Sequence, residues 1–346
     1  MKILIVKLSS LGDVLHLFPA ISDLRRNFPE AEIHWLVEPA FAEVAGWHSA
    51  IDKVIPVALR AQKKIWWKIP SLLMRLRKML QVERYDIVLD AQGLFKSAIM
   101  ARLADAPVYG FHADSAREWV AARFYQKTAK VIDGLHVIEK NRQLVAQTFL
   151  IEQPREIDYG LEKFRQQRTK TELTAELKEM TKQPCVVLLH GTTWSSKYWP
   201  EAFWAELITS FTQQGWRCLL PWGNEAELQR ANRLQEAGGE LAKVLPKLSL
   251  TELMNVLIQA QSFVSVESGI GHLAAALDVS GVMLHGPTSP DYSGILGKRC
   301  QHITSGVNCS PCFKRNCPII DKSNVPPCQQ RITPQQVLLR MKKLVA

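Results

Sequence analysis

Short apolar runs alternate with longer stretches of helical spacing along the whole chain. The runs have the length and composition of buried parallel strands; they are residues 2–8, 33–37, 87–89, 185–189, 218–220 and 263–266. The stretches of helical spacing are residues 14–27, 95–104, 200–213 and 250–259. This alternation predicts an α/β fold, with helices packed on parallel sheets. Because the pattern occurs in each half of the chain, we expect two doubly wound domains.

The length of the chain also favours two domains. Its 346 residues exceed the usual size of one domain, and an apolar content of 47% is enough for two cores. We place the boundary near Asp158, which gives an N-terminal domain of residues 1–158 and a C-terminal domain of residues 159–346. The charge-rich segment 162–182 is expected to form a solvent-facing helix. A terminal helix is predicted at 334–345, after a cysteine-rich loop at 309–328.

Polar segments follow three of the predicted strands, and the carboxyl ends of strands are where open α/β sheets bind ligands. In the first segment, residues 9–14, a turn glycine precedes Asp13 at the mouth of a helix. Asp13 could cap this helix by accepting backbone N–H bonds, which would lower the pKa of its carboxyl. It could instead remove a proton from a substrate hydroxyl. The segment by itself favours the capping role.

The second polar segment, residues 190–200, combines hydroxyls, backbone N–H groups and Lys197 shortly before a helix. Such donors suit a diphosphate, although the spacing is not that of a Walker loop. The alternative is a solvent loop whose tryptophans pack on the helix. In the third segment, residues 267–273, Ser268 is expected to cap a helix. Glu267 is an acidic side chain at the end of a strand, and such side chains commonly bind sugar hydroxyls through paired hydrogen bonds. His272 alone would more often be a core histidine.

The formal net charge of +10 predicts an anionic partner, which can be nucleic acid, a phospholipid surface or a phosphorylated sugar. The densest basic stretch, residues 60–80, also contains Trp66 and Trp67. As a helix it would suit a membrane surface, or it would pack on the N-terminal sheet as an ordinary amphipathic helix. No apolar run reaches the roughly 18 residues of a membrane span, and the opening residues predict a strand in place of a signal peptide. We therefore expect the chain in the cytoplasm.

The chain has seven cysteines, and four of them lie close together in the sequence near its C-terminal end. Their spacing, Cys309-x2-Cys312-x4-Cys317 followed by Cys328, can build a tetrahedral structural zinc site. The alternatives are reduced thiols, or disulfides formed on handling, because the cytosol keeps most thiols reduced.

A set of segments, each weak alone, is specific in combination and order. It consists of Lys7, residues 9–16, residues 90–94 with 96–98, residues 116–118, Thr192, Thr193, Lys197, residues 199–200, residues 220–223, and residues 268–269 with His272. This set resembles the ADP-heptose:lipopolysaccharide heptosyltransferases of glycosyltransferase family 9, most of all the heptosyltransferase I branch. The resemblance covers nearly the whole chain.

The resemblance implies a GT-B fold, in which two Rossmann-like domains face a central cleft. The N-terminal domain takes a lipid-linked acceptor and the C-terminal domain takes the nucleotide sugar. The family transfers L-glycero-D-manno-heptose from ADP-heptose to a Kdo hydroxyl of the lipopolysaccharide inner core, with inversion at the anomeric carbon. It needs no metal or other cofactor for this reaction. The expected partners are thus ADP-heptose, a Kdo-lipid A acceptor and the cytoplasmic face of the inner membrane, with no nucleic acid.

The resemblance also implies roles for residues that match the family's motifs. Asp13 aligns with the general base, and Lys197 with a residue that offsets charge on the leaving diphosphate. The implied donor-binding residues are Thr192, Thr193, Lys197, Glu227 at the ribose, Leu248 at the adenine, Glu267 at the heptose, Ser268, Gly269 and His272. Glu267 stands where the family usually has Asp, and its extra methylene bears on which donor sugar is bound. Ser268 stands where the family usually has Thr, a change that keeps the hydroxyl.

The implied acceptor-binding residues are mostly cationic and belong to the N-terminal half. They are Lys7, Ser10, Gly12, Arg60, Lys63, Lys64, Gln92, Arg117 and His136.

Two alternatives stay open. One is another GT-B glycosyltransferase of lipopolysaccharide core synthesis, such as heptosyltransferase II or III, or an enzyme that uses a different nucleotide sugar. The other is a non-enzymatic binder of nucleic acid or anionic lipid, for which the net charge and the tryptophan pair would be the main signs.

Overall fold

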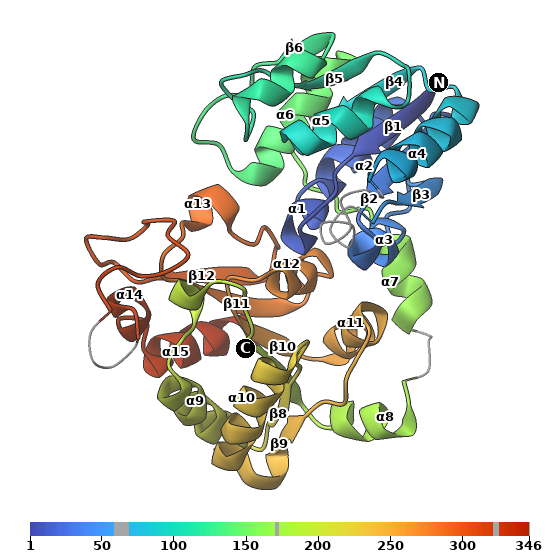
Figure 1. Ribbon diagram of the computed structural model, residues 1–346. Helices are drawn as coiled ribbons and strands as arrows, with labels where there is room; N and C mark the ends of the chain where they lie inside the picture. Colours follow the sequence, from blue (N-terminus) through green and yellow to red (C-terminus); the bar gives the residue numbers. More distant parts are fainter. Residues whose placement is uncertain (59–68, 170–172, 321–324, 346) are drawn as a thin grey trace. The chain divides into compact units, whose positions relative to one another are not determined.

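The structure is a computed structural model, which describes residues 1–58, 69–169, 173–320 and 325–345 (Figure 1). The chain divides into two compact units, Met1–Phe164 and Arg165–Ala346. The division follows Phe164, whereas the sequence analysis placed it near Asp158.

The first unit is built on a six-stranded parallel sheet with the order β3-β2-β1-β4-β5-β6 (Figure 1). Its strands are β1 Lys2–Val6, β2 Glu32–Val37, β3 Lys53–Pro56, β4 Ile87–Asp90, β5 Val108–Phe111 and β6 Lys127–Ala129. The strand order reverses between β1 and β4, which makes the carboxyl ends of these two strands the expected place for a ligand. The α/β, doubly wound prediction is confirmed for this unit.

Helices cover both faces of the first sheet. The helices of this unit are α1 Leu11–Leu15, α2 Phe18–Asn27, α3 Pro39–Ala45, α4 Ile69–Glu83, α5 Phe95–Arg102, the 3-10 helix η3 Trp119–Phe124 and α6 Val137–Phe149. The next helix, α7 Glu162–Thr169, crosses the boundary between the two units. The prediction of one helix over residues 14–27 is wrong, because α1 ends at Leu15 and α2 starts anew at Phe18. Pro19 falls in the first turn of α2, where its missing N–H removes no helical hydrogen bond.

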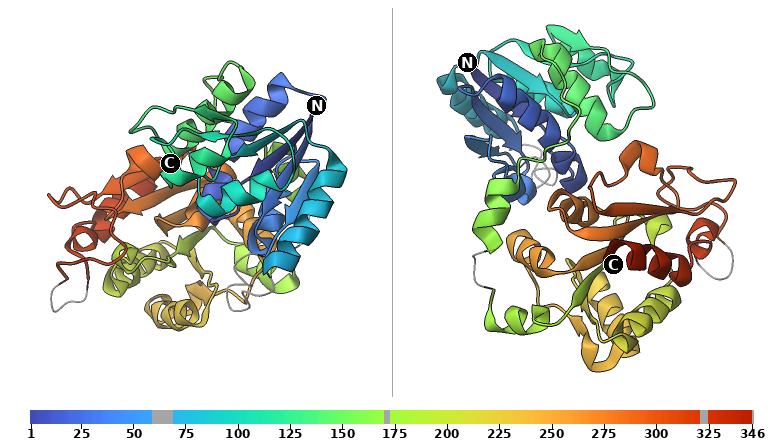
Figure 2. Two further views of the ribbon diagram at one scale, coloured as in Figure 1. Left: turned by 45° about the horizontal axis from the view of Figure 1, so that its top comes forward. Right: turned by 180° about the vertical axis from the view of Figure 1, so that it is seen from behind.

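The second unit repeats the architecture with the sheet order β12-β11-β10-β7-β8-β9 (Figures 1 and 2). Its strands are β7 Cys185–Leu189, β8 Arg217–Leu220, β9 Ala242–Val244, β10 Ser262–Val266, β11 Ser280–His285 and β12 Cys300–Thr304. All of these pairings are parallel, and the order reverses between β7 and β10. The polar segments at 190–200 and 267–273 thus follow the two strands at the switch point.

The second unit also has helices on both faces of its sheet. They are α8 Ala175–Thr181, η4 Ser195–Lys197, α9 Glu201–Gln213, α10 Glu225–Gln235, η5 Glu236–Leu241, α11 Leu250–Gln259, α12 Gly269–Ala276, α13 Pro290–Ser293, α14 Pro327–Gln330 and α15 Pro334–Val345. Val264 and Val266 of β10 share a core with α9, α10 and α15. Ser265, which points to the other face, lies against Gly271 of α12.

The terminal helix agrees with its prediction at 334–345. The single helix predicted over 162–182 is wrong: the segment holds two helices, α7 and α8. Thr174 starts the second, because its hydroxyl accepts a hydrogen bond from the backbone N–H of Leu177. In the described ranges, no helix has the length and apolar character needed to cross a membrane.

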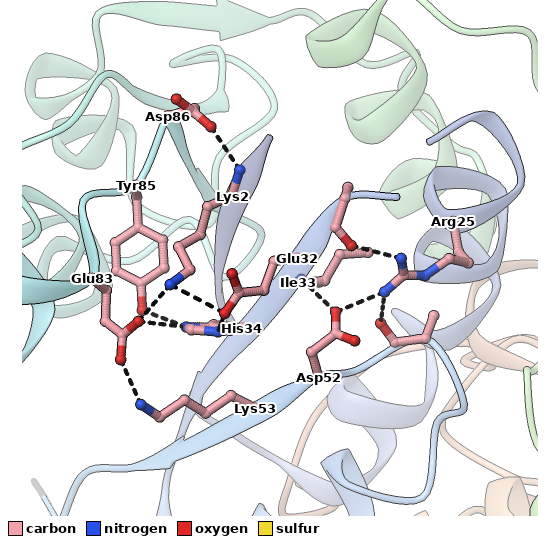
Figure 3. Close-up of polar contacts among 12 residues, drawn as sticks. Lys2, Arg25, Glu32, Ile33, His34, Asp52, Lys53, Glu83, Tyr85 and Asp86 are labelled. Carbon is pink, nitrogen blue, oxygen red and sulfur yellow. Dashed lines mark hydrogen bonds and ion pairs between the residues drawn. The ribbon is translucent and has the colours of Figure 1, made fainter. Parts of the chain in front are cut away.

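An ion-pair network ties the edge of the first sheet to the end of α4 (Figure 3). The Glu83 carboxylate lies 2.6 Å from Lys2 Nζ and 2.5 Å from Lys53 Nζ. The buried His34 ring lies 2.8 Å from Tyr85 Oη through Nδ1 and 2.8 Å from Glu32 Oε1 through Nε2. Hydrogen bonds from the two lysines lower the pKa of Glu83 to about 2, because they favour the charged carboxylate.

Glu83→Gln is expected to destabilise the protein by about 1 kcal/mol at pH 7, since the two ion pairs of this residue are lost and such pairs are individually weak. The pKa of Glu83 is depressed in the folded state from 4.5, so its contribution is complete above about pH 4.5 and is lost as the pH falls toward 2. Denaturant unfolding at pH 7, 5 and 3 measures this difference between variant and native chain. Glu30→Gln, at an exposed acid in the same unit, is the matched control; an equal loss for both variants would contradict the account.

Candidate active site

Asp13 lies in α1, which follows β1, and its carboxylate is held by Ser10 and Arg117. Oδ2 accepts the backbone N–H of Ser10 at 2.9 Å, as the capping interpretation of the sequence expects. The same carboxylate makes a two-pronged contact with Arg117, with Nη1 3.2 Å from Oδ2 and Nη2 2.5 Å from Oδ1. Burial raises the pKa of Asp13, but Lys7, Arg117 and the Ser10 N–H outweigh it, and the net shift is downward. Asp13 is therefore a charged carboxylate in this state.

The turn after β4 positions Arg117. The buried Asp90 carboxylate accepts hydrogen bonds from the backbone N–H groups of Gln92 and Gly93 and from Ser97 Oγ and Tyr125 Oη. Gly93 has a φ of +69°, and a Cβ there would lie 3.3 Å from the backbone nitrogen of Arg117. The turn can approach the Arg117 segment this closely because residue 93 is glycine. The sequence analysis gave no role to Asp90, although its place at the end of a buried strand was visible.

Lys7 lies under the Asp13 site, and only 4% of the residue is exposed. Its Nζ donates a hydrogen bond to the carbonyl oxygen of Ala91 at 2.5 Å. Burial lowers the pKa of Lys7 to about 8. The positive charge of Arg117 lowers this pKa as well, whereas the negative charge of Asp13 raises it. Lys7 thus supplies a buried positive charge that favours the ionised form of Asp13.

Two further predicted acceptor residues have structural partners in the first unit. Gln92 is 2% exposed, and its Oε1 accepts the backbone N–H groups of Leu8 and Ser9. His136 caps α6 by accepting the N–H of Ile138, and its ring centroid lies 6.3 Å from that of His16. Both residues shape the surroundings of α1.

The remaining predicted acceptor residues differ in what the structure says of them. Ser10 and Gly12 lie in the turn and helix that carry Asp13, so they share its position. Arg60, Lys63 and Lys64 lie outside the described residues.

Lys197 of η4 and Glu267 at the end of β10 form an ion pair in the second unit, with Nζ 2.5 Å from Oε2. The side chains are 10% and 12% exposed. Lys197 Nζ also lies 4.0 Å from the centre of the Trp194 ring, a distance that permits cation–π attraction. Thr192 joins the same place, since its Oγ1 donates to the Glu267 carbonyl oxygen at 3.3 Å. The structure therefore brings Thr192, Lys197 and Glu267 together, and Thr193 follows directly in the exposed loop.

The N-terminus of α12 lies beside this ion pair in the sequence. Ser268 caps the helix as predicted, because its Oγ accepts the N–H of Gly271 at 3.2 Å. Gly269 is the first helical residue, and His272, in the first turn, is 6% exposed. A helix N-terminus next to a lysine attracts phosphate oxygens. This arrangement can bind an anion.

Glu227, in the first turn of α10, reaches back to the end of β7. Its Oε2 accepts the N–H of Gly223 at 2.8 Å, and a Cβ at Gly191 would lie 2.7 Å from the carboxylate carbon. Gly191 is thus required for this approach, a role that the sequence analysis did not assign. Leu248, in the loop before α11, is half-buried.

Few side chains that could bind a metal lie close together in the described part of the chain. Across these ranges, the His, Cys, Asp and Glu group with ligand atoms mutually within 4.8 Å is Glu32, His34 and Glu83, and Lys2 and Lys53 already neutralise its carboxylates (Figure 3). The four cysteines of the predicted zinc site are free thiols that form no such group; they are Cys309, Cys312, Cys317 and Cys328. At these separations the four thiols do not form a tetrahedral zinc site.

Comparisons with known proteins agree with this geometry. The family model "Glycosyltransferase family 9 (heptosyltransferase)" matches residues 73–322. Lipopolysaccharide heptosyltransferase 1 of Pseudomonas aeruginosa is 42% identical, over 100% of this chain and 98% of its own. The Escherichia coli K12 protein of the same name is 41% identical, over 86% of this chain and 92% of its own.

Solved structures give the same result. The E. coli heptosyltransferase WaaC with ADP superposes with a TM-score of 0.84 at 35% identity, covering 99% of both chains. The same protein with ADP-2-deoxy-2-fluoro heptose gives a TM-score of 0.81 with the same coverage.

Two doubly wound units and this likeness define a glycosyltransferase of the GT-B fold class. More narrowly, the chain belongs to glycosyltransferase family 9, the heptosyltransferases. The predicted family and enzyme class are confirmed. The expectation that the two domains face a central cleft stays a prediction.

Asp13→Asn is expected to lower the pKa of Lys7 further below about 8, because it removes the charge that raises this pKa and leaves that of Arg117 in place. A pH titration of the chain with 13C-labelled lysine, followed by NMR, measures the shift. Asp114→Asn, an exposed carboxylate paired with Lys130 in the same unit, is the control and should leave the Lys7 titration unchanged. An unchanged Lys7 pKa in Asp13→Asn would show that the two groups are not coupled.

Proposed function

We propose that this enzyme is a heptosyltransferase I, which moves L-glycero-D-manno-heptose from ADP-heptose to a Kdo hydroxyl of the lipopolysaccharide inner core, with inversion. The observation that carries the proposal is the likeness to a heptosyltransferase with an ADP-heptose analogue over 99% of the chain. The relatives named heptosyltransferase 1, at 41–42% identity, favour this branch over heptosyltransferases II and III.

The second unit binds the nucleotide sugar in this proposal. Lys197 exchanges its ion pair with Glu267 for the diphosphate of ADP-heptose, and the hydroxyls of Thr192 and Thr193 add donors for the same oxygens. Glu227 binds the ribose, Leu248 contacts the adenine, and Ser268, Gly269 and His272 line the diphosphate and sugar. As the bond from the anomeric carbon to the diphosphate oxygen breaks, negative charge grows on that oxygen, and Lys197 offsets it.

When the diphosphate replaces Glu267 as the partner of Lys197, the Glu267 carboxylate can accept hydrogen bonds from heptose hydroxyls. A glutamate reaches one methylene further than the aspartate usual in the family. If the enzyme prefers another nucleotide sugar, the difference is therefore expected to come from the contact between Glu267 and the donor sugar.

The first unit supplies the base. Asp13 takes the proton of the acceptor hydroxyl while the hydroxyl oxygen attacks the anomeric carbon and ADP departs. In the structure Arg117 pairs with this carboxylate and depresses its pKa, which weakens Asp13 as a base. An anionic acceptor resolves the conflict, because its carboxylate or phosphate takes the Arg117 guanidinium and leaves Asp13 free with a higher pKa.

The acceptor is lipid-linked in this proposal, and the surface of α4 suits an enzyme that works at the cytoplasmic face of the inner membrane. Met74 is 61% and Val82 81% exposed. Arg75, Arg77 and Lys78 are exposed on the same helix. Apolar and cationic side chains together favour an anionic lipid surface.

Asp13→Asn is expected to reduce kcat by about 10²- to 10⁴-fold, because a general base contributes a factor of this size. ADP affinity should stay unchanged, since Asp13 belongs to the acceptor side. Steady-state kinetics and calorimetric ADP titration measure the two quantities, with Asp114→Asn as control. Near-normal kcat, or a lost ADP affinity, would overturn the assignment of Asp13.

The proposed reaction itself is tested by ADP release from purified enzyme with a Kdo-bearing lipid A acceptor and a panel of nucleotide sugars. We expect ADP release only when the donor is ADP-heptose and the acceptor is present. Release only with another donor would replace heptose by that sugar and make Glu267 the residue to explain. Release that continues without acceptor would indicate donor hydrolysis and contradict the transfer.

A further inference from the structure

We infer that the cysteine-rich segment is a positioning element for Lys197, acting through hydrogen bonds to the two serines that precede it. The element consists of residues 310–316 and Gln329, and is called here the η4 brace. The inference rests on the proposed role of Lys197 in donor binding, and deepens it by naming what holds that lysine in place.

The η4 brace contacts η4 through both serines of this short helix. Ser196 donates its backbone N–H to the Arg315 carbonyl oxygen at 3.1 Å and its hydroxyl to the Lys314 carbonyl oxygen at 2.6 Å. Ser195 Oγ lies 3.1 Å from the Arg315 carbonyl oxygen and 2.8 Å from Asn316 Oδ1. These contacts join positions more than a hundred residues apart in the sequence, so they do not follow from local chain geometry.

Gln329 closes the other side of η4. Its Nε2 donates to the Ser196 carbonyl oxygen at 3.2 Å, and the residue is fully buried. Ser196 itself is 1% exposed. The backbone N–H, hydroxyl and carbonyl of Ser196 are thus all bound to the brace, in a place where an unmade hydrogen bond is costly.

The brace is itself fixed to the sheet, so it can transmit rigidity. The backbone N–H groups of Cys312 and Phe313 both donate to the Pro287 carbonyl oxygen, at 3.0 and 2.8 Å, just beyond β11. Ser310 Oγ donates to the Gly286 carbonyl oxygen at 2.5 Å. A Cβ at Gly286 would lie 3.1 Å from Cys328 Sγ, which shows how closely this part of the chain packs on the strand end.

Lys197 directly follows the braced serines and is the residue that the brace orients. η4 is one short 3-10 turn, which by itself holds a side chain poorly. The brace also adds a second cation to the Trp194 ring, since the Arg315 guanidinium lies 5.6 Å from its centre and Lys197 Nζ 4.0 Å. Trp194 and the brace together fix the direction in which Lys197 leaves the turn.

The test compares ADP affinity, by calorimetry, for the native chain, Ser196→Ala and Gln329→Met. Each variant removes one hydrogen bond between η4 and the brace: Ser196→Ala the bond to the Lys314 carbonyl oxygen, and Gln329→Met the bond to the Ser196 carbonyl oxygen. Each retains most of the side-chain volume. Each is expected to weaken ADP binding by about 3- to 10-fold, with acceptor KM unchanged. Ser210→Ala and Gln214→Ala are matched controls, because these side chains bond only to carbonyl oxygens of their own helix region among the contacts described.

A double-mutant cycle with Lys197→Ala separates positioning from general damage. If the brace acts through Lys197, Ser196→Ala causes no further loss of ADP affinity once Lys197 is absent. An additional loss of the same size would show that the serine acts independently of Lys197 and would overturn the inference. Thermal unfolding of each variant checks that the fold is retained.

The outcomes also distinguish the brace from the proposed function. If the native chain does not bind ADP, the donor site assignment fails. If it binds ADP and both Ser196→Ala and Gln329→Met bind equally well, the donor site stands and the brace is wrong.

Discussion

The ion pair between Asp13 and Arg117 is the interaction on which the first unit's site depends. It joins the turn after β1 to a segment 104 residues further along the chain. Arg117 arrives there because Asp90 binds four donors and shapes the turn at Gly93, against which the Arg117 segment packs. The buried Asp90 carboxylate thus positions the guanidinium that pairs with Asp13, whose side chain is 18% exposed. In our proposal the same pair also sets the catalytic problem, since Asp13 is a weak base while the guanidinium holds it and a stronger one once the acceptor has taken the guanidinium.

The second unit contains the same kind of interaction, a cation paired with a carboxylate of its own chain. The charge of Lys197 is balanced by Glu267, and in our proposal the diphosphate of the donor competes with Glu267 for this lysine. Desolvated pairs of this kind favour a ligand that replaces one partner with a charge of equal sign and better geometry. Each unit thereby keeps its binding cation paired with a carboxylate from its own chain, and in our proposal an anionic substrate takes the place of that carboxylate.

The sequence predicted three neighbouring strands in each sheet, because buried parallel strands are continuous apolar runs, as residues 185–189 illustrate. It missed β3, β5, β6, β9, β11 and β12, most of which are short or lie toward the sheet edges. It failed where one periodic stretch holds two helices, as at Pro19 and Thr174, since periodicity does not show a change of axis. The polar segments after predicted strands gave Asp13 and Lys197 as candidates, and the resemblance assigned their roles and added Arg117. The ion pairs Asp13–Arg117 and Lys197–Glu267 could not be predicted from sequence spacing, because the two partners of each pair are far apart along the chain. Lys314 and Arg315 bind the serines of η4 through their backbone carbonyl oxygens. Every residue type has such an oxygen, so the sequence does not indicate these contacts.

The proposed reaction transfers heptose, with inversion, to a Kdo hydroxyl. NMR and mass spectrometric analysis of the acceptor after reaction with ADP-heptose examines both the bond formed and its configuration. We expect an acceptor heavier by one heptosyl unit, linked to Kdo, with an anomeric configuration opposite to that of the donor. A retained configuration, or ADP formed while the acceptor mass is unchanged, would contradict it.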